Sequence, residues 1–185
     1  MGYPRRDERP GTYHHVGTRG NNQQPIYRDD GSRILFLLRL GIVVHRHDWT
    51  LISYCLMTNH YHLVIKLGGC GMARGMQELN GGYAIAFNMR YGRRDHLFGR
   101  RFWNRDIEDD DDLLETARYI ELNPCRKGMV GSPEDWRWSG YRAAAGIDTL
   151  EPFHQPTELW GLFDKQPRLA MGAYERFVRE GLLGP

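Results

Sequence analysis

The chain has 185 residues, a formal net charge of +2, 41% hydrophobic and 26% charged residues, a composition typical of a folded domain. Its most apolar stretch, residues 34–44, is too short for a membrane span and is interrupted by Arg39. Cys55, Cys70 and Cys125 form no Cys-x-x-Cys pair, and residues 1–9 contain no apolar segment. We therefore expect a cytoplasmic protein without a membrane helix, secretory signal, disulfide scaffold or zinc ribbon.

The charges are distributed unevenly along the chain. Residues 1–105 carry 16 Lys and Arg against 7 Asp and Glu, whereas residues 106–185 carry 9 against 16. Nearly all of the basic residues are arginine, which suits phosphate oxygens and base edges. A GC-rich genome would also explain the arginine content, but not the segregation. The segregation favours a basic face for a polyanion.

The first predicted elements are a strand at residues 12–18 and a loop at 19–22. Asp29 and Asp30 precede apolar residues at helical spacing, from Ile34 to Ile42, which predicts a helix with acidic residues at its start. Residues 49–57 and 60–67 are apolar, β-branched runs separated by Thr58-Asn59, a pattern typical of a hairpin.

Residues 72–91 show helical spacing, although Gly81 and Gly82 each weaken a helix by about 1 kcal/mol relative to alanine. Residues 97–107 are predicted as a fourth strand, and residues 109–122 as a helix ended by Asn123-Pro124. The order β-α-β-β-α-β indicates an α+β, ferredoxin-like antiparallel sheet with helices on one face and an added helix. We expect residues 1–145 to form one domain and residues 146–185 a C-terminal helical appendage packed on it.

His60 and His62 lie two residues apart at the start of a predicted strand. Both side chains therefore point to one face of the sheet, while Tyr61 points to the other. Two histidines on one face can hold a metal ion, but the pattern fits equally well a pair at a hairpin mouth that binds nothing.

The third predicted helix supplies two partners for these histidines. If its apolar residues between 113 and 120 face the core, Tyr119 lies nearly opposite them and Asn123 lies one turn beyond Tyr119. Taken singly, Tyr119 fits a surface aromatic and Asn123 a helix cap. Together with His60 and His62 they form a candidate site with a nucleophile and a metal.

Five segments, in order, resemble the IS200-like single-tyrosine transposases, which carry a His-x-His (HUH) motif, and most of all the REP-associated tyrosine transposases. The resemblance covers roughly residues 10–145. Thr58 stands where the family usually has proline, Tyr61 fills the middle of the motif, and Gly140 stands where serine is common. The matching segments are Tyr13-His14-His15-Val16 with Arg19-Gly20-Asn21, Met57–Ile65, Leu97–Phe102, Arg118–Pro124 and Trp136–Tyr141.

The resemblance implies a metal-dependent DNA strand transferase that nicks and rejoins single-stranded DNA, at hairpin or palindromic repeats. Tyr119 would form a 5′-phosphotyrosine and release a 3′-hydroxyl, with a metal held by His60, His62 and Asn123. Phenols are poor nucleophiles at neutral pH, so a divalent ion that neutralises charge on the phosphate would help. Two imidazoles, an amide oxygen and water suit Mg²⁺ or Mn²⁺.

The expected partner is single-stranded DNA with hairpin structure, which implies a nucleoid-associated location. Phe98, Phe102, Trp103 or Trp138 could stack on unpaired bases, and either His14 or His15 could line the site. The family contains both monomers and homodimers, so the oligomeric state stays open. The candidate phosphate contacts are Arg19, Arg90, Arg93, Arg94, Arg100, Arg101 and Arg105.

Two alternatives stay open on the sequence. A replication-initiator or relaxase-like HUH nickase shares the chemistry, but such proteins usually place the motif and the tyrosine in a different order. A non-enzymatic module that grips nucleic-acid hairpins with its sheet would not need His60, His62 and Tyr119 together.

Overall fold

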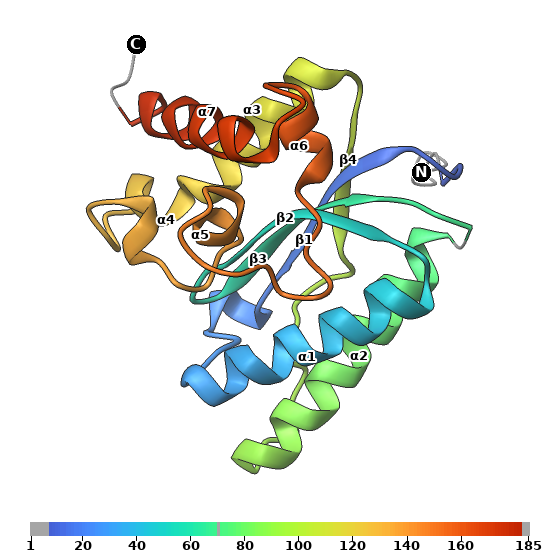
Figure 1. Cartoon of the computed structure of the whole chain (residues 1–185). Helices are drawn as coiled ribbons and strands as arrows, with labels where there is room; N and C mark the ends of the chain where they lie inside the picture. Colours follow the sequence, from blue (N-terminus) through green and yellow to red (C-terminus); the bar gives the residue numbers. More distant parts are fainter. Residues whose placement is uncertain (1–7, 70, 183–185) are drawn as a thin grey trace.

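A four-stranded antiparallel sheet lies at the centre of the computed structural model, which describes residues 8–69 and 71–182 (Figure 1). Cys70 and residues 1–7, which entered the expectations about cysteines and signal sequences, lie outside the described residues. The strands have the order β2-β3-β1-β4, which confirms the predicted α+β fold. They are β1 (Tyr13–Arg19), β2 (Thr50–Leu56), β3 (His60–Lys66) and β4 (Trp103–Ile107).

Helices cover both faces of the sheet, whereas the sequence predicted one covered face (Figure 1). The helices α1 (Asp30–Arg46) and α2 (Met72–Tyr91) pack on one face, against Leu63 and Ile65 of β3. On the other face, α3 (Asp110–Glu121), α5 (Tyr141–Ala144), α6 (Thr157–Gly161) and α7 (Pro167–Glu180) share a second core with Val64. The central strands are apolar on both sides, and each side needs its own cover.

Aspartate side chains cap the N-termini of α1 and α3. The Asp29 carboxylate accepts a hydrogen bond from the Ser32 backbone N–H at 2.7 Å and caps α1. Asp109 does the same for α3, accepting from the Asp112 N–H at 2.8 Å. The acidic run at residues 108–112 therefore lies at a helix N-terminus, where the helix dipole favours negative charge.

The fourth strand is shorter than predicted, because it begins at Trp103 rather than at residue 97. Residues 97–99 instead bind the loop after β1: the Leu97 carbonyl accepts from the Asn21 N–H at 2.9 Å, and the Gly99 N–H donates to Arg19 at 3.2 Å. Arg100 and Arg101 therefore lie in a connecting segment and not on the strand.

The chain does not leave the helical conformation at Asn123-Pro124. Leu122 has φ −85° and ψ −5°, and the short helix α4 (Asn123–Arg126) follows, with Pro124 in its first turn, where the missing N–H costs nothing. Short 3₁₀ turns lie at η1 (Asn21–Gln23) and η2 (Pro133–Asp135). Within the described residues, no helix has the length and apolar character needed to cross a membrane.

Candidate active site

Three histidines gather on the face of the sheet that α3 covers. In the β1–β3 register Gly17 pairs with His62 and Arg19 with His60, so alternation places His15 on the same face as both histidines of the motif. The ring centroids of His60 and His62 are 5.0 Å apart, and His15 Nε2 lies 3.0 Å from His62 Nδ1. The structure thus brings His60 and His62 together and adds His15.

The hydrogen bonds of these rings leave both Nε2 atoms as acceptors. His60 Nδ1 lies 2.7 Å from the Asn59 side-chain oxygen, which can only accept, so the proton is on Nδ1. The Asn123 side-chain N–H points to His62 Nε2 at 3.4 Å, so that nitrogen accepts and His62 Nδ1–H donates to His15. A neutral histidine with a free lone pair on Nε2 can bind a metal through that nitrogen.

All three imidazoles are neutral at neutral pH. Burial, together with the neighbouring His15 and His60, lowers the pKa of His62 to about 2. Burial, together with the positive charge of Arg105 near His15 and of Arg19 near His60, lowers the pKa of each of these two histidines to about 4. Protons therefore do not compete with a cation for these nitrogens.

Tyr119 borders the same cluster from α3. Its side chain is 46% exposed, and its ring centroid lies 6.1 Å from that of His62 and 6.3 Å from that of His15. The Arg126 guanidinium lies over the ring at 5.6 Å from the centroid. A cleft of about 460 Å³ opens here, lined by His15, Arg105, Asp112, Glu115, Thr116, Tyr119 and Arg126. The phenol is therefore accessible to a substrate.

Asn123 completes a set of donors that fits a divalent cation. Its side chain is buried and its Nδ2 lies 3.4 Å from His62 Nε2, whereas its Oδ1 makes no hydrogen bond. Within the described part of the chain, no group of three or more His, Cys, Asp or Glu side chains could hold a metal. A metal at this place would be held by His60, His62 and, once the Asn123 amide turned its unpaired oxygen toward them, Asn123, a donor set that suits Mg²⁺ or Mn²⁺.

Trp103 closes one side of the histidine cluster, and Gly17 makes room for it. The indole lies 4.6 Å from the His15 ring and 5.7 Å from the His62 ring, measured between centroids. A Cβ on Gly17 would lie only 2.8 Å from the Trp103 ring. Trp103 is also exposed, whereas the other aromatic residues considered for base stacking pack in or against the core: Phe98, Phe102 and Trp138.

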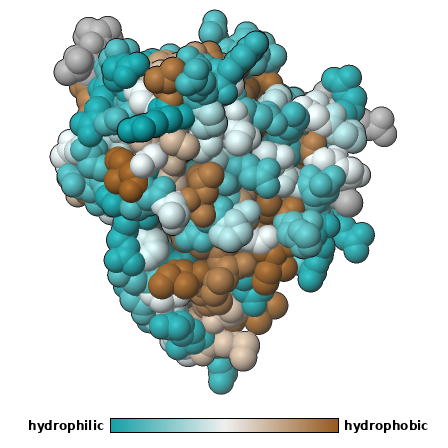
Figure 2. Space-filling view, viewed as in Figure 1, coloured by the Kyte–Doolittle hydropathy of each residue, from teal (hydrophilic) through white to brown (hydrophobic). Residues whose placement is uncertain are grey.

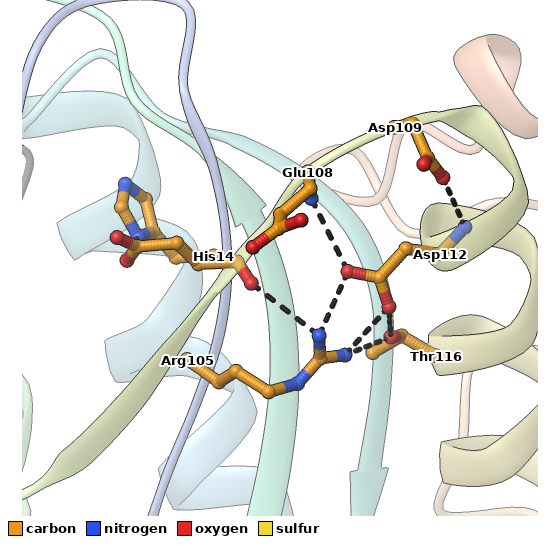
Figure 3. Close-up of polar contacts among 7 residues, drawn as sticks. His14, Arg105, Glu108, Asp109, Asp112 and Thr116 are labelled. Carbon is orange, nitrogen blue, oxygen red and sulfur yellow. Dashed lines mark hydrogen bonds and ion pairs between the residues drawn. The ribbon is translucent and has the colours of Figure 1, made fainter.

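Arg105 is engaged within the protein (Figure 3). Its guanidinium binds both carboxylate oxygens of Asp112, at 2.7 and 2.9 Å, and also bonds the Thr116 hydroxyl. The guanidinium holds the pKa of Asp112 below its usual range. Arg105 thus ties β4 to the first turns of α3 and forms a wall of the cleft.

The other arginines predicted to contact phosphates do not form one cluster. Arg19 ends β1 beside His60, with Arg100 and Arg101 in the segment next to it. Arg93 and Arg94 line a second cleft, of about 420 Å³, together with the polar loop 21–24. Arg90 lies at the end of α2, 3.9 Å from Asp29, and lines neither of these clefts.

Comparison with known proteins gives consistent results. Residues 11–123 match the family described as "Transposase IS200 like". A Haemophilus influenzae protein named as a REP-associated tyrosine transposase is 26% identical over 110 residues, 49% of this chain and 57% of that relative, so the chain spans little more than half its length. The fold resembles a solved REP-associated tyrosine transposase bound to a REP hairpin, with a TM-score of 0.66 and 18% identity, covering 84% of this chain and 94% of that one.

Proposed function

Because the chain belongs to the IS200-like transposase family, we propose that it nicks and rejoins single-stranded DNA at hairpin repeats through a covalent tyrosine intermediate. Membership of the family already makes it a DNA-processing enzyme. The observation that carries the finer proposal is the position of the accessible Tyr119 beside His62, which Asn123 contacts.

Tyr119 acts as the nucleophile in this proposal. Its phenolic oxygen forms a bond to the scissile phosphorus and the P–O3′ bond breaks, which leaves a 5′-phosphotyrosine and a 3′-hydroxyl. The phenolic proton passes to solvent, and the departing 3′-oxygen takes a proton. Rejoining is the reverse attack by a 3′-hydroxyl, so no nucleotide cofactor is consumed.

Two sources of positive charge beside Tyr119 would support this attack. A divalent ion, Mg²⁺ or Mn²⁺, would be held by His60, His62 and Asn123 and would neutralise charge on the phosphate oxygens. The Arg126 guanidinium, 5.6 Å from the centroid of the Tyr119 ring, would supply a second positive charge from the protein itself. A phosphate bound between them would be held close to the phenol.

The proposed substrate is hairpin DNA, since the structurally similar transposase was solved bound to a REP hairpin. Arg19, Arg100 and Arg101 would contact phosphates near the histidines, and Arg93 and Arg94 would contact them at the second cleft. Trp103 would stack on an unpaired base next to His15.

The test is covalent capture. A labelled single-stranded hairpin substrate is incubated with Mn²⁺, and the protein is then resolved on a denaturing gel and mapped by peptide mass. We expect a 5′-phosphate adduct on the peptide that contains Tyr119, and its loss in Tyr119→Phe, which keeps the ring and removes only the hydroxyl.

Tyr91→Phe is the matched control, because Tyr91 lies at the end of α2, outside the cleft. It should retain the adduct. An adduct that persists in Tyr119→Phe would refute the assignment of the nucleophile. Nicking without any adduct would indicate a hydrolytic nuclease instead.

A further inference from the structure

An apolar surface lies on the side of the molecule that faces away from the histidines. Ile34, Leu38 and Ile42 recur every four residues on α1 and are exposed, with Leu38 at 61%. Ile85 and Met89, at the same spacing on α2, are exposed as well. Figure 2 shows apolar side chains gathered over these two helices in the lower part of the view. Soluble monomers rarely expose such a contiguous patch, so it indicates an interface.

Gly81 of α2 lies one turn before Ile85 on the same stripe. No heavy atom lies within 4 Å of the position that a Cβ would take there, so nothing inside the protomer requires its missing side chain. Glycine in a helix costs about 1 kcal/mol relative to alanine. A bare backbone next to exposed apolar residues allows a second helix to approach closely.

The charges at the two ends of the apolar row on α1 indicate which partner binds this surface. Asp30 precedes Ile34 by four residues, and Arg46 follows Ile42 by four. This row of side chains on α1 is therefore about 24 Å long, with an acidic residue at one end, a basic residue at the other and three apolar residues between them. Both end side chains are exposed and now make ion pairs at the surface, Asp30 with Arg137 and Arg46 with Glu78. When two copies of α1 lie antiparallel, the acidic end of each row faces the basic end of the other, and the apolar residues face one another.

We propose that this face binds a second copy of the chain and forms a two-fold dimer. The two α1 helices cross antiparallel, with Leu38 of both copies at the axis and Ile34 of one beside Ile42 of the other. Asp30 of one copy then lies near Arg46 of its partner. Figure 1 shows α1 and α2 on the face of the sheet opposite α3. Each protomer would therefore keep its own histidine–tyrosine cleft, away from the dimer interface.

Sedimentation velocity of the full chain over a range of concentrations tests the dimer. We expect the wild type to dimerise and Leu38→Glu, which places two carboxylates at the axis, to weaken dimerisation at least tenfold. Leu169→Glu is the matched control, because Leu169 is a 54% exposed leucine on α7. It should dimerise like the wild type. Circular dichroism verifies that each variant is folded.

A charge reversal tests the antiparallel arrangement. Asp30→Arg alone and Arg46→Asp alone each place like charges together across the axis, so each should weaken the dimer, and the double variant should restore it. A wild type that stays monomeric at every concentration would overturn the proposal. A dimer that survives Leu38→Glu, or one that the double variant fails to restore, would place the interface elsewhere.

Discussion

His15 fixes the orientation of the histidine that is central to the candidate site. Its Nε2 accepts the proton of His62 Nδ1 at 3.0 Å, which leaves His62 Nε2 facing Asn123. Residues that orient a metal-binding histidine in this way typically change metal affinity by 10- to 100-fold when they are removed. If the proposed metal is bound, His15 would act on it through His62, as a positioning residue.

Replacing His15 with leucine should weaken Mn²⁺ binding by roughly 10- to 100-fold, because His62 loses the acceptor that holds its tautomer. Titration of free Mn²⁺ by electron paramagnetic resonance measures this without any activity assay. His14→Leu is the matched control: His14 precedes His15 on β1 but faces the other side of the sheet, where it pairs with Asp106 at 3.0 Å. Equal affinities in the two variants would contradict the role given to His15.

The sequence could not distinguish His14 from His15. Both faces of β1 carry mixed residues, with Tyr13, His15 and Gly17 on one and His14 and Val16 on the other, so no alternation reveals which face is which. The pairing of β1 with β3 decides the question, and that pairing joins residues about 45 apart in sequence. By contrast, His60 and His62 share a face by spacing alone.

At the scale of elements, a buried carboxyl joins three of them. Glu121 at the end of α3 is fully buried, and its oxygens accept hydrogen bonds from Ser53 of β2 at 2.9 Å and from Tyr174 of α7 at 2.8 Å. Burial raises the pKa of Glu121 to about 7, although both hydrogen bonds act to lower it. This network holds the helix that carries Tyr119 against the sheet.

The raised pKa makes stability depend on pH. The folded protein holds the Glu121 proton up to about pH 7, whereas the unfolded chain releases it near its ordinary pKa of 4.5. The stabilisation is therefore complete below pH 4.5 and is lost as pH rises through 7, by about 1.4 kcal/mol per pH unit in between. From pH 5 to pH 8 the wild type should lose on the order of 2 kcal/mol relative to Glu121→Gln.

Urea unfolding of both proteins at the two pH values measures this difference. Glu115→Gln, on the same helix but exposed, should show the pH dependence of the wild type. Parallel curves for the wild type and Glu121→Gln would mean that Glu121 is ionised in the folded protein at pH 5.

Local sequence patterns predicted those elements whose alternation or helical spacing is visible within their own residues. The strands β1 to β3 and the helices α1 to α3 follow from alternation, helical spacing and acidic caps. The start of β4 did not follow, because residues 97–99 bind the loop after β1 instead of extending the sheet. The cover on the second face was also missed, since the short α5 and α6 become helical only by packing on it.

At the scale of the whole molecule, the basic and acidic residues that are segregated along the sequence also lie on different parts of the surface. Most of the predicted arginines follow β1 and the segment before β4, whereas carboxylates line the first turn of α3. Arg105 is already paired with Asp112, so it contributes less free charge than the sequence suggested. The exposed Arg94, Arg100 and Arg101 are the better candidates for phosphate contacts.

Replacing Arg94, Arg100 and Arg101 together with alanine should flatten the salt dependence of hairpin binding. Each phosphate contact on single-stranded DNA contributes about 0.7 to the slope of log K against log salt, so the loss of three should reduce the slope by roughly 2. Fluorescence anisotropy between 50 and 300 mM salt, about the range over which such contacts weaken, measures the slope. The control replaces Lys165, Arg168 and Arg176, which are also exposed but lie on or next to α7. Both variants lose the same net charge, so a general loss of attraction would change the two slopes equally. An effect confined to the first variant would place the DNA on the surface around the end of β1 and the segment before β4.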